Sequence, residues 1–395
     1  MANSSIISPE EGRTGERAAL LALLFGNLVI GTGVLLPAGI INELSRDLNV
    51  TIPRVATLIG FGAIVLCIGA PVLAFLTNRI DRRMLLVGCL LVFALGHAAS
   101  SLAPNFEMLL AIRLMMIAAA AVFTPQAAST IGVFVAPERR AAGVAFIFLG
   151  WSLANAVCLP LSSLIAAHLG WRASYDVLAA LCVVSAISLW LTLAGRLYVA
   201  PMSVSSWLTV FRSRQILAVL LVTGLSLAGQ FTLFPYLAPE FKRIASDDPA
   251  LIALALAVFG AGGVLGTLIM ARIVGRIGTT TAIALCLGNT ALGLVVWAAF
   301  AQDAVTAIAA IALWGLAFSS SNSLQQARLI GISPELASAS VALNTSILYV
   351  GQAIGTSIGA ALISAGRPDL MGWVGASIVI CALCMSIFVA RHLRA

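Results

Sequence analysis

Charged residues are scarce in this sequence. Only 9% of its residues are Asp, Glu, Lys or Arg, whereas an ordinary soluble domain carries about 25%. Hydrophobic residues make up 61% of the chain instead. A single soluble core stops growing at roughly 250–300 residues, so a soluble fold has nowhere to hide this much apolar surface. A lipid bilayer solvates such a surface with hydrocarbon, and the composition therefore predicts a membrane protein.

Sites that need clustered charge or sulfur are also lacking. The net charge is +7 with a single lysine, Lys242, but the basic residues stand in short loops between apolar runs, which argues against nucleic acid as a partner. The seven cysteines all lie in apolar runs, with neither metal-ligand spacing nor the pattern of a disulfide framework. No grouping of His, Asp and Ser indicates catalysis. We therefore expect no metal, no cofactor and no enzymatic activity.

The sequence does contain twelve apolar runs that are long enough to cross a bilayer. A spanning helix needs about 20 apolar residues, and runs that do not alternate in hydrophobicity are helices rather than strands. The predicted transmembrane helices cover residues 18–41, 54–76, 84–103, 106–133, 143–168, 172–195, 215–239, 249–271, 279–301, 304–327, 336–363 and 370–390.

The distribution of arginine predicts how these helices are oriented. Residues 1–17 are polar and lack the basic segment of a cleaved signal peptide. If both termini are cytoplasmic, 15 of the 22 basic residues lie in cytoplasmic segments and 6 in outer segments. Short cytoplasmic loops carry the excess of Lys and Arg in membrane proteins. The sequence therefore predicts a multi-pass protein with cytoplasmic N and C termini.

The two halves of the chain resemble each other. The first predicted helix contains GTGVLLPAGIINEL (31–44) and the seventh contains AGQFTLFPYLAPEF (228–241), each with a Pro and then a Glu near its outer end. The fold class predicted is an all-α membrane protein with 12 transmembrane helices in two pseudo-symmetric six-helix bundles. Its segments are a cytoplasmic tail (1–17), an N-terminal bundle (18–195), a cytoplasmic linker (196–214), a C-terminal bundle (215–390) and a second tail (391–395).

The loop after the second helix, residues 74–83, resembles the signature loop of the major facilitator superfamily, Gly-x-x-x-Asp-Arg-x-Gly-Arg-Arg. Ala74 takes the place of the first Gly, Asn78 that of the Asp and Asp81 that of the second Gly. The resemblance implies a cytoplasmic gate that latches one conformation, whereas on charge alone the loop sets topology. The residues of this predicted gate loop are Asn78, Arg79, Asp81, Arg82 and Arg83.

Further motifs resemble bacterial drug and sugar proton antiporters of the twelve-helix, arabinose-efflux type. They are Arg113 with the small residues after it, the segment PERRAAG (137–143), and a fifth helix whose motif includes Asn155, Cys158 and Pro160. The resemblance covers nearly the whole chain. It implies the major facilitator fold, in which two six-helix halves rock around a midplane site, a bacterial inner-membrane location, a monomer, and export by proton antiport.

Neutral polar residues within the spans are the best indication of a pathway. An unsatisfied amide in hydrocarbon costs several kcal/mol, so these side chains should face inward. Each one by itself is explained as well by a helix-to-helix hydrogen bond, but the whole set indicates a shared water-filled cavity. The predicted substrate-binding residues are Asn27, Thr32, Gln126, Asn155, Gln230, Asn322, Gln326, Asn344, Tyr349 and Gln352.

Carboxylates are missing from the middle of every predicted span, and the place where related exporters carry one in the first helix is Val34. His97, with an unperturbed pKa of ~6.5, and Asp176 are left as candidates for proton coupling. Arg113 lies inside the fourth span, where a charge usually faces a cavity, so it is predicted to orient substrate or proton. The alternative for Arg113 is a structural charge bonded to backbone carbonyls.

These observations favour an exporter of a small amphipathic or drug-like solute that works by alternating access. Coupling to protons is what the resemblance implies. Two alternatives stay open. The missing carboxylates favour an uncoupled facilitator of a neutral solute. A non-transporting membrane receptor is an alternative of another class, although such a protein usually carries a soluble signalling domain, and the sequence contains none.

Overall fold

The computed structural model describes residues 9–77, 79–136, 139–193, 195, 197–198, 209–333 and 336–392. Within these ranges the regular elements are all helical. They are α1 (Pro9–Gly39), α2 (Ile41–Asp47), α3 (Ile52–Leu76), α4 (Arg82–Ser101), α5 (Phe106–Phe134), α6 (Arg140–Leu153), η2 (Ala154–Cys158), α7 (Leu159–Leu169), α8 (Trp171–Thr192), α10 (Arg214–Phe231), η3 (Phe234–Tyr236), α11 (Leu237–Ile244), α12 (Pro249–Ile277), α13 (Thr279–Phe300), α14 (Ala304–Ile332), α15 (Ala337–Ser364), η5 (Pro368–Leu370) and α16 (Met371–His392).

Twelve of the described helical segments are long and apolar enough to cross a membrane, which confirms the predicted number. Several helices run past the predicted ends. Helix α12 continues six residues beyond residue 271, through Arg272 and Arg276, and ends at Gly278, whose φ of 78° is a left-handed conformation. Hydropathy marks where hydrocarbon ends, but the backbone hydrogen bonds continue until a residue such as glycine stops the helix.

The first predicted span is interrupted in the structure. Helix α1 ends at Gly39, and the short helix α2 begins at Ile41. Pro37 lacks a backbone N–H, so the carbonyl four residues earlier, on Gly33, has no helical partner. The chain therefore changes direction near the outer end of the predicted span 18–41.

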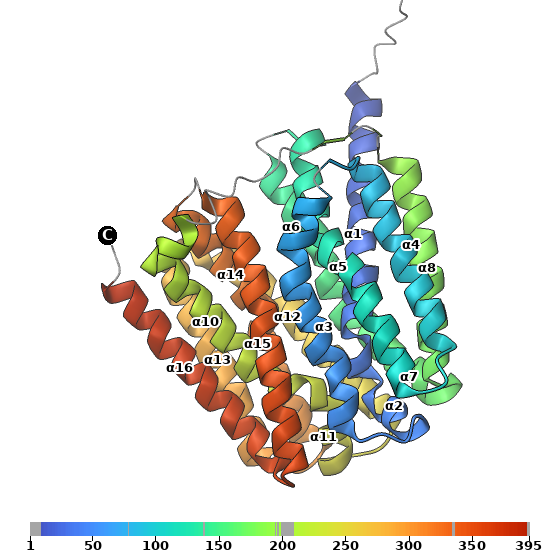
Figure 1. The fold of residues 1–395 in the computed structure, drawn as a ribbon. Coiled ribbons are helices and arrows are strands. Elements are labelled where there is room, and N and C mark those ends of the chain that lie inside the picture. The colour runs from blue at the N-terminus through green and yellow to red at the C-terminus, as the bar shows by residue number, and fades with distance from the viewer. Residues whose placement is uncertain are drawn as a thin grey trace, which may run out of the picture.

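The spans pack as two groups (Figure 1). Helices α1 to α8, the N half, pack against one another, and α10 to α16, the C half, do the same. We call the end of the bundle that holds the start of α1 and the end of α16 the terminal side, and the opposite end, which holds α2 and α11, the distal side. The exact limits of the predicted bundles stay a prediction. Of the predicted linker and tails, residues 1–8, 196, 199–208 and 393–395 lie outside the described residues.

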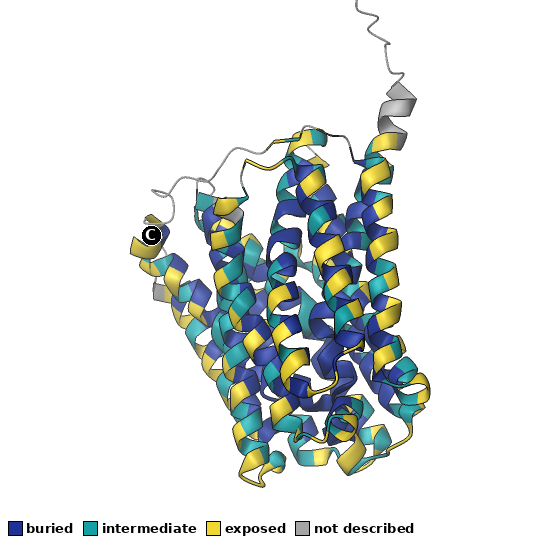
Figure 2. Cartoon of the chain, turned by 45° about the vertical axis from the view of Figure 1, so that its right-hand side comes forward, coloured by how far each residue is buried: buried dark blue, intermediate teal, exposed yellow. Residues whose placement is uncertain are grey.

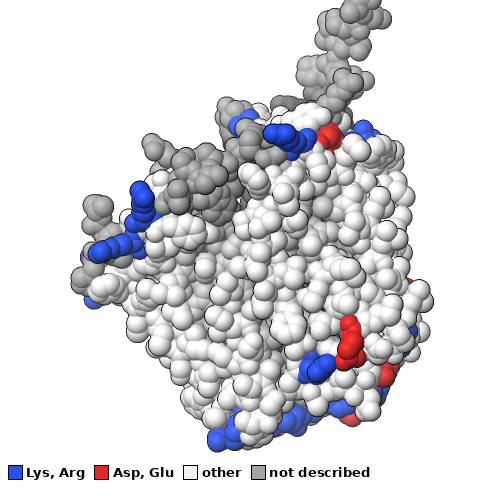
Figure 3. All heavy atoms as spheres, in the orientation of Figure 1, with Lys and Arg blue, Asp and Glu red and all other residues white. Residues whose placement is uncertain are grey.

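The outer surface of the bundle suits hydrocarbon. Figure 3 shows a broad band without Lys, Arg, Asp or Glu between two ends where charges gather. Figure 2 shows exposed positions on the outward faces of the helices, and large apolar side chains such as Leu95 (71% exposed) and Leu191 (75% exposed) stand on them. An exposed apolar surface of this extent is stable only within a bilayer.

Candidate transport pathway

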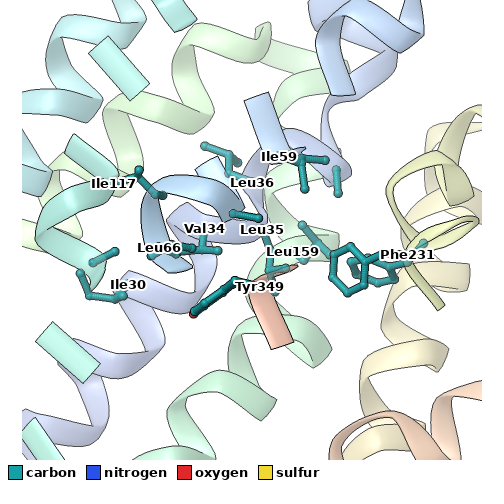
Figure 4. Close-up of a cluster of buried hydrophobic side chains, with 14 of the residues drawn as sticks. Ile30, Val34, Leu35, Leu36, Ile59, Leu66, Ile117, Leu159, Phe231 and Tyr349 are labelled. Carbon is teal, nitrogen blue, oxygen red and sulfur yellow. The ribbon is translucent and has the colours of Figure 1, made fainter. Parts of the chain in front are cut away.

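The distal ends of the two halves are in contact. Helix α2 packs against α11, and η3 packs against both α1 and α3. Figure 4 shows the apolar layer beside this contact, where Val34 and Leu66 of the N half lie together with Phe231 and Tyr349 of the C half. Apolar side chains from both halves therefore close the distal side.

Two longer seams join the halves. In one, α3 packs against α15, and the Ser346 hydroxyl donates a hydrogen bond to the carbonyl oxygen of Cys67 at 3.2 Å. In the other, α12 packs against η2 and α7. Cys67 lies nine residues before the terminal-side end of α3. In Figure 1 the ribbons of the two halves draw apart toward the terminal side. The halves are thus docked through their distal parts.

A polar cluster links three helices of the N half. The Thr124 hydroxyl on α5 donates to Oδ1 of Asn27 on α1 at 2.9 Å, and the indole N–H of Trp151 on α6 lies 3.4 Å from the Thr124 oxygen. The Asn27 amide nitrogen donates to the carbonyl of Leu23 at 3.1 Å. Asn27 is fully buried, while Thr124 and Trp151 are half-buried.

A matching cluster links three helices of the C half. The Thr223 hydroxyl on α10 donates to Oδ1 of Asn344 on α15 at 2.8 Å. The Asn344 amide nitrogen donates to Oδ1 of Asn322 on α14 at 3.0 Å. Helices α10, α14 and α15 are the first, fourth and fifth spans of their half, as α1, α5 and α6 are in the other half. The internal repeat therefore extends to the polar contacts.

The remaining predicted substrate-binding residues divide by burial. Gln230 is buried and accepts a hydrogen bond from the Trp314 indole N–H at 3.1 Å. Thr32 donates to the carbonyl of Leu28 at 2.7 Å, and Gln126 accepts from the Ser129 hydroxyl at 3.2 Å. These three side chains are each hydrogen-bonded within the protein. Those with partly exposed side chains are Asn322, Gln326 and Gln352.

Arg113 is held by backbone carbonyls. Its Nε donates to the carbonyl of Leu58 on α3 at 2.8 Å, and its two terminal nitrogens donate to the carbonyls of Gly33 at 3.0 Å and Val34 at 2.7 Å on α1. The Gly33 carbonyl is the one that Pro37 leaves without a helical partner. The buried guanidinium therefore ties α1, α3 and α5 together at the site where α1 is interrupted.

Arg113 also borders the interface between the halves. It lines a cavity of about 10 Å³, together with Phe231 and Gln352 of the C half. That volume is about the space that one water molecule needs. The arrangement fits the structural alternative for Arg113 and also places the charge beside a polar residue of the opposite half.

His97 lies near Arg113, and Asp176 does not join them. The His97 Nδ1 is 2.7 Å from the carbonyl oxygen of Phe93, and its ring centroid is 5.7 Å from that of Tyr175. Both His97 and Tyr175 are fully buried, and the His97 Nε2 and the Tyr175 hydroxyl have no hydrogen-bond partner. Asp176, the next residue on α8, is exposed. Of the three predicted coupling residues, the structure brings together His97 and Arg113.

The predicted gate loop is bound to the N half. Asp81 caps α4 by accepting from the backbone N–H of Met84 at 3.1 Å, and it also accepts from the N–H of Leu197 at 2.7 Å. The Arg83 guanidinium stacks over the Trp190 ring at 4.0 Å. Arg82 is 2% exposed, and Arg79 is exposed. Asn78 lies outside the described residues.

The predicted helix-5 motif forms a π-helical turn. Pro160 has no N–H for the carbonyl of Ala156, and the π-helix η2 lies directly before it. Such turns are often found at functional sites. Asn155 in this turn is 6% exposed, its amide nitrogen donates to the Trp151 carbonyl at 3.0 Å, and its Oδ1 has no partner. A Cβ at Gly260 on α12 would overlap the backbone of η2, so the motif lies at a seam between the halves.

One buried amide was missing from the predicted binding set. Gln325 on α14 is 1% exposed, and neither of its side-chain polar atoms has a hydrogen-bond partner. The predicted set contains its neighbours Asn322 and Gln326 but not Gln325. Since Gln325 lies three residues after Asn322, the helical period places the two on adjoining faces, and this spacing was the available signal.

Twelve apolar helices among the described residues, packed as two docked halves with buried polar clusters, define a polytopic helical transporter. The profile of the Major Facilitator Superfamily matches residues 21–356. The chain therefore belongs to that superfamily. Its members are transporters rather than enzymes, as expected from the sequence.

Relatives and a solved structure agree with this assignment. The chain is 29% identical over 349 residues to the inner membrane transport protein YdhP of Escherichia coli K12, covering 88% of this chain and 89% of that one. It is 30% identical over 253 residues to a chloramphenicol resistance protein of Streptomyces lividans (62% and 64%), and 25% identical over 370 residues to a probable sugar efflux transporter of Helicobacter pylori (90% and 90%). A bacterial homologue of the lysosomal transporter Spinster, in an inward-facing and unoccupied conformation, shares the fold, with a TM-score of 0.66, 16% identity and 95% coverage of both chains.

Proposed function

We propose that this transporter exports a small amphipathic or drug-like solute across a bacterial inner membrane by alternating access, as a monomer and in antiport with protons. The observation that carries the proposal is the one-sided docking of the halves. Apolar contacts join them at the distal side, and their ribbons draw apart toward the terminal side. Alternating access in this fold is a rocking of one half against the other about a central site.

The proposed orientation places the terminal side in the cytoplasm. It rests on the excess of arginine in the segments at that end, because cytoplasmic loops carry the basic residues. In this orientation the arrangement seen here is closed to the outside. A solute leaving the cytoplasm would then enter between the halves, and the gate loop at residues 79–83 would stand beside its entrance.

The proposed binding residues are those that the sequence predicts, centred on the two polar clusters. Opening either cluster would offer a solute polar groups from three helices, and the partly exposed Asn322, Gln326 and Gln352 are the first side chains that it would meet. Two relatives are named for chloramphenicol resistance and for sugar efflux. Both names fit a site of neutral polar groups with apolar walls, which is what ligand pockets usually present.

Substitution of the clusters tests this assignment. Asn344→Ala should remove the amide oxygen that accepts from Thr223 and the amide nitrogen that donates to Asn322. The free energy of unfolding should decrease by about 1 kcal/mol, as for other hydrogen bonds between membrane helices. We expect the transport rates of Asn344→Ala and Gln126→Ala to decrease by more than this small loss of stability can explain. Ser377→Ala is the control, since Ser377 is exposed and bonds within its own helix. Unchanged transport in both folded variants would remove these residues from the binding site.

His97 is the proposed coupling residue, with Asp176 as a further candidate, and Arg113 is proposed to orient substrate or proton. His97 is buried on α4 against α1, and its Nε2 has no partner. A histidine that gains access to water when the halves move could bind and release a proton. The alternative is an uncoupled facilitator. The hydrogen bonds of Arg113 favour it, because a guanidinium that is already bonded to three backbone carbonyls does not require a titratable side chain as its partner.

The experiment that tests export begins with a panel of toxic compounds, including chloramphenicol and sugars, on a deletion strain and an overexpressing strain. Compounds whose toxicity changes are then assayed in proteoliposomes with and without a pH gradient. An antiporter accumulates the compound only with the gradient, whereas a facilitator equilibrates it equally well in both. If overexpression leaves tolerance to every compound unchanged and no uptake occurs in vesicles, export of such solutes is wrong.

We expect Glu43 on α2 to make distal closure depend on pH, because opening of the contact with α11 would return its carboxyl to water. Burial raises the pKa of this carboxyl above its ordinary 4.5, against smaller opposing effects of its backbone hydrogen bond, Arg46 and Lys242. A raised pKa means that the closed arrangement holds the proton more tightly, so its stability is greatest below pH 4.5 and decreases as pH rises through the raised pKa. Spin labels at Asn49 and Asp247 should therefore lie closer together in acid. Glu43→Gln should abolish the pH dependence, and an unchanged dependence would rule out Glu43.

A further inference from the structure

A groove of about 680 Å³ lies along the seam where α3 of the N half packs against α15 of the C half. On α3 it is lined by Ile64, Cys67 and Ile68. On α15 the lining residues recur every three or four positions from Val350 to Ala361, which is one stripe of a helix. The groove shares no lining residue with the cavity beside Arg113, and side chains at its rim are open to the surroundings of the bundle, with Ile68 59% and Ile354 50% exposed.

The polar groups in the groove need no outside partner. The Ser357 hydroxyl donates to the carbonyl of Ala353 on its own helix at 2.8 Å. The carbonyl of Cys67 accepts the Ser346 hydroxyl across the seam. The other lining side chains are apolar, so a ligand that enters the groove gains contact with hydrocarbon and loses nothing by having no hydrogen-bonding group.

The length and depth of the groove match one leaflet of a bilayer. Val350 and Ala361 are eleven residue steps apart, which corresponds to about 16 Å at 1.5 Å per residue, and half of the hydrocarbon thickness is about 15 Å. Ala361 lies three residues before the distal end of α15 at Ser364, and Val350 lies near the middle of that helix. Along α15 the groove thus runs from the distal edge of the membrane to its midplane, and its α3 lining, Ile64, Cys67 and Ile68, lies at the midplane end, from the middle of α3 onward.

We propose that the groove binds an acyl chain of a phospholipid from the distal leaflet. The bilayer is the medium at this depth, and a chain lying in the groove would touch both halves of the transporter. Because α3 and α15 belong to different halves, the bound chain favours the arrangement in which they form the groove over any arrangement that alters the seam. The site does not depend on the identity of the exported solute.

Photo-cross-linking tests the site without any solute. The full chain is reconstituted in vesicles of phosphatidylethanolamine and phosphatidylglycerol in which a small fraction of acyl chains carries a diazirine. After irradiation, cross-linked peptides are measured by mass spectrometry. We expect the yield at 64–68 and 350–361 to exceed several-fold the yield at Leu91 and Leu95, which are 44% and 71% exposed on α4. Equal yields on the two surfaces would overturn the proposal.

Substitutions that fill the groove provide a second test of the lipid site. Ile354→Trp should reduce cross-linking at 64–68 several-fold, and Leu95→Trp, the same change on an exposed position of α4, should not. Ser357→Phe replaces Ile354→Trp if the latter is not monodisperse after purification, since Ser357 is exposed in the groove. Cross-linking at 64–68 that survives a bulky residue in the groove would show that the chain lies elsewhere.

Discussion

Arg113→Lys should abolish most transport and lower the thermal stability of the protein. The guanidinium joins three carbonyls on two helices, whereas a lysine ammonium is a point donor that cannot span them. A hydrogen bond from a charged donor contributes about 1.5–3 kcal/mol. The loss of two such bonds would exceed 1.4 kcal/mol, which corresponds to a factor of about ten in an equilibrium constant. Initial transport rates and Tm in detergent measure the two effects.

Arg54→Lys is the matched control for that substitution. Arg54 also lies near the distal side, but it is exposed and pairs with Glu107 at 2.8 Å, and such surface pairs contribute about 0–1 kcal/mol. We expect Arg54→Lys to retain transport and Tm. If Arg113→Lys transports at the rate of the unmodified protein with an unchanged Tm, the tie between α1, α3 and α5 has no importance for the cycle.

Gly260→Val should reduce transport about ten-fold or more while each half stays folded. A side chain at this position overlaps the backbone of Asn155 and Ala156 across the seam. Backbone cannot rotate aside as a side chain can, and overpacking of this kind costs about 1–3 kcal/mol. Because the contact joins α12 to η2, the cost falls on the docking of the halves and shifts the protein away from the distal-closed arrangement.

Gly275→Val on the same helix is the control, because a Cβ there meets nothing within 4 Å. Gly275→Val replaces a glycine of α12 with the same β-branched side chain. The distribution of distances between the two halves on the distal side should shift to longer values for Gly260→Val and stay unchanged for Gly275→Val. Equal distances in the two variants, with equal transport, would mean that the seam at η2 does not govern closure.

The fold could be predicted largely from the sequence, because each span is a local property. Every predicted run, from 18–41 to 370–390, is matched by a membrane-spanning helix, since hydropathy alone decides where a helix can face lipid. The errors are at helix ends. The break after Gly39 and the extension of α12 to Ile277 depend on proline and glycine chemistry and on loops outside the membrane, which mean hydropathy does not reflect.

The partners within the site could be predicted far less well, because they are distant in sequence. Thr124 meets Asn27 across 97 positions, and Arg113 meets Gly33 across 80. One partner had a local signal, since Pro37 frees the carbonyl of Gly33, and a buried arginine is the natural donor for such a group. Nothing comparable in the sequence distinguishes an amide bonded to a neighbouring helix, such as Asn344, from one that faces a cavity.

The rocking of the two halves is tested most directly by locking the distal side. Arg46 on α2 and Lys242 on α11 are both exposed at the distal contact. In a background without the seven native cysteines, Arg46→Cys and Lys242→Cys are combined and joined by a short, reducible bifunctional thiol reagent. We predict that the cross-link stops transport of a compound identified in the toxicity panel and that reduction restores it, while either single variant treated in the same way keeps its rate. Undiminished transport by the fully cross-linked protein would contradict alternating access through these two halves.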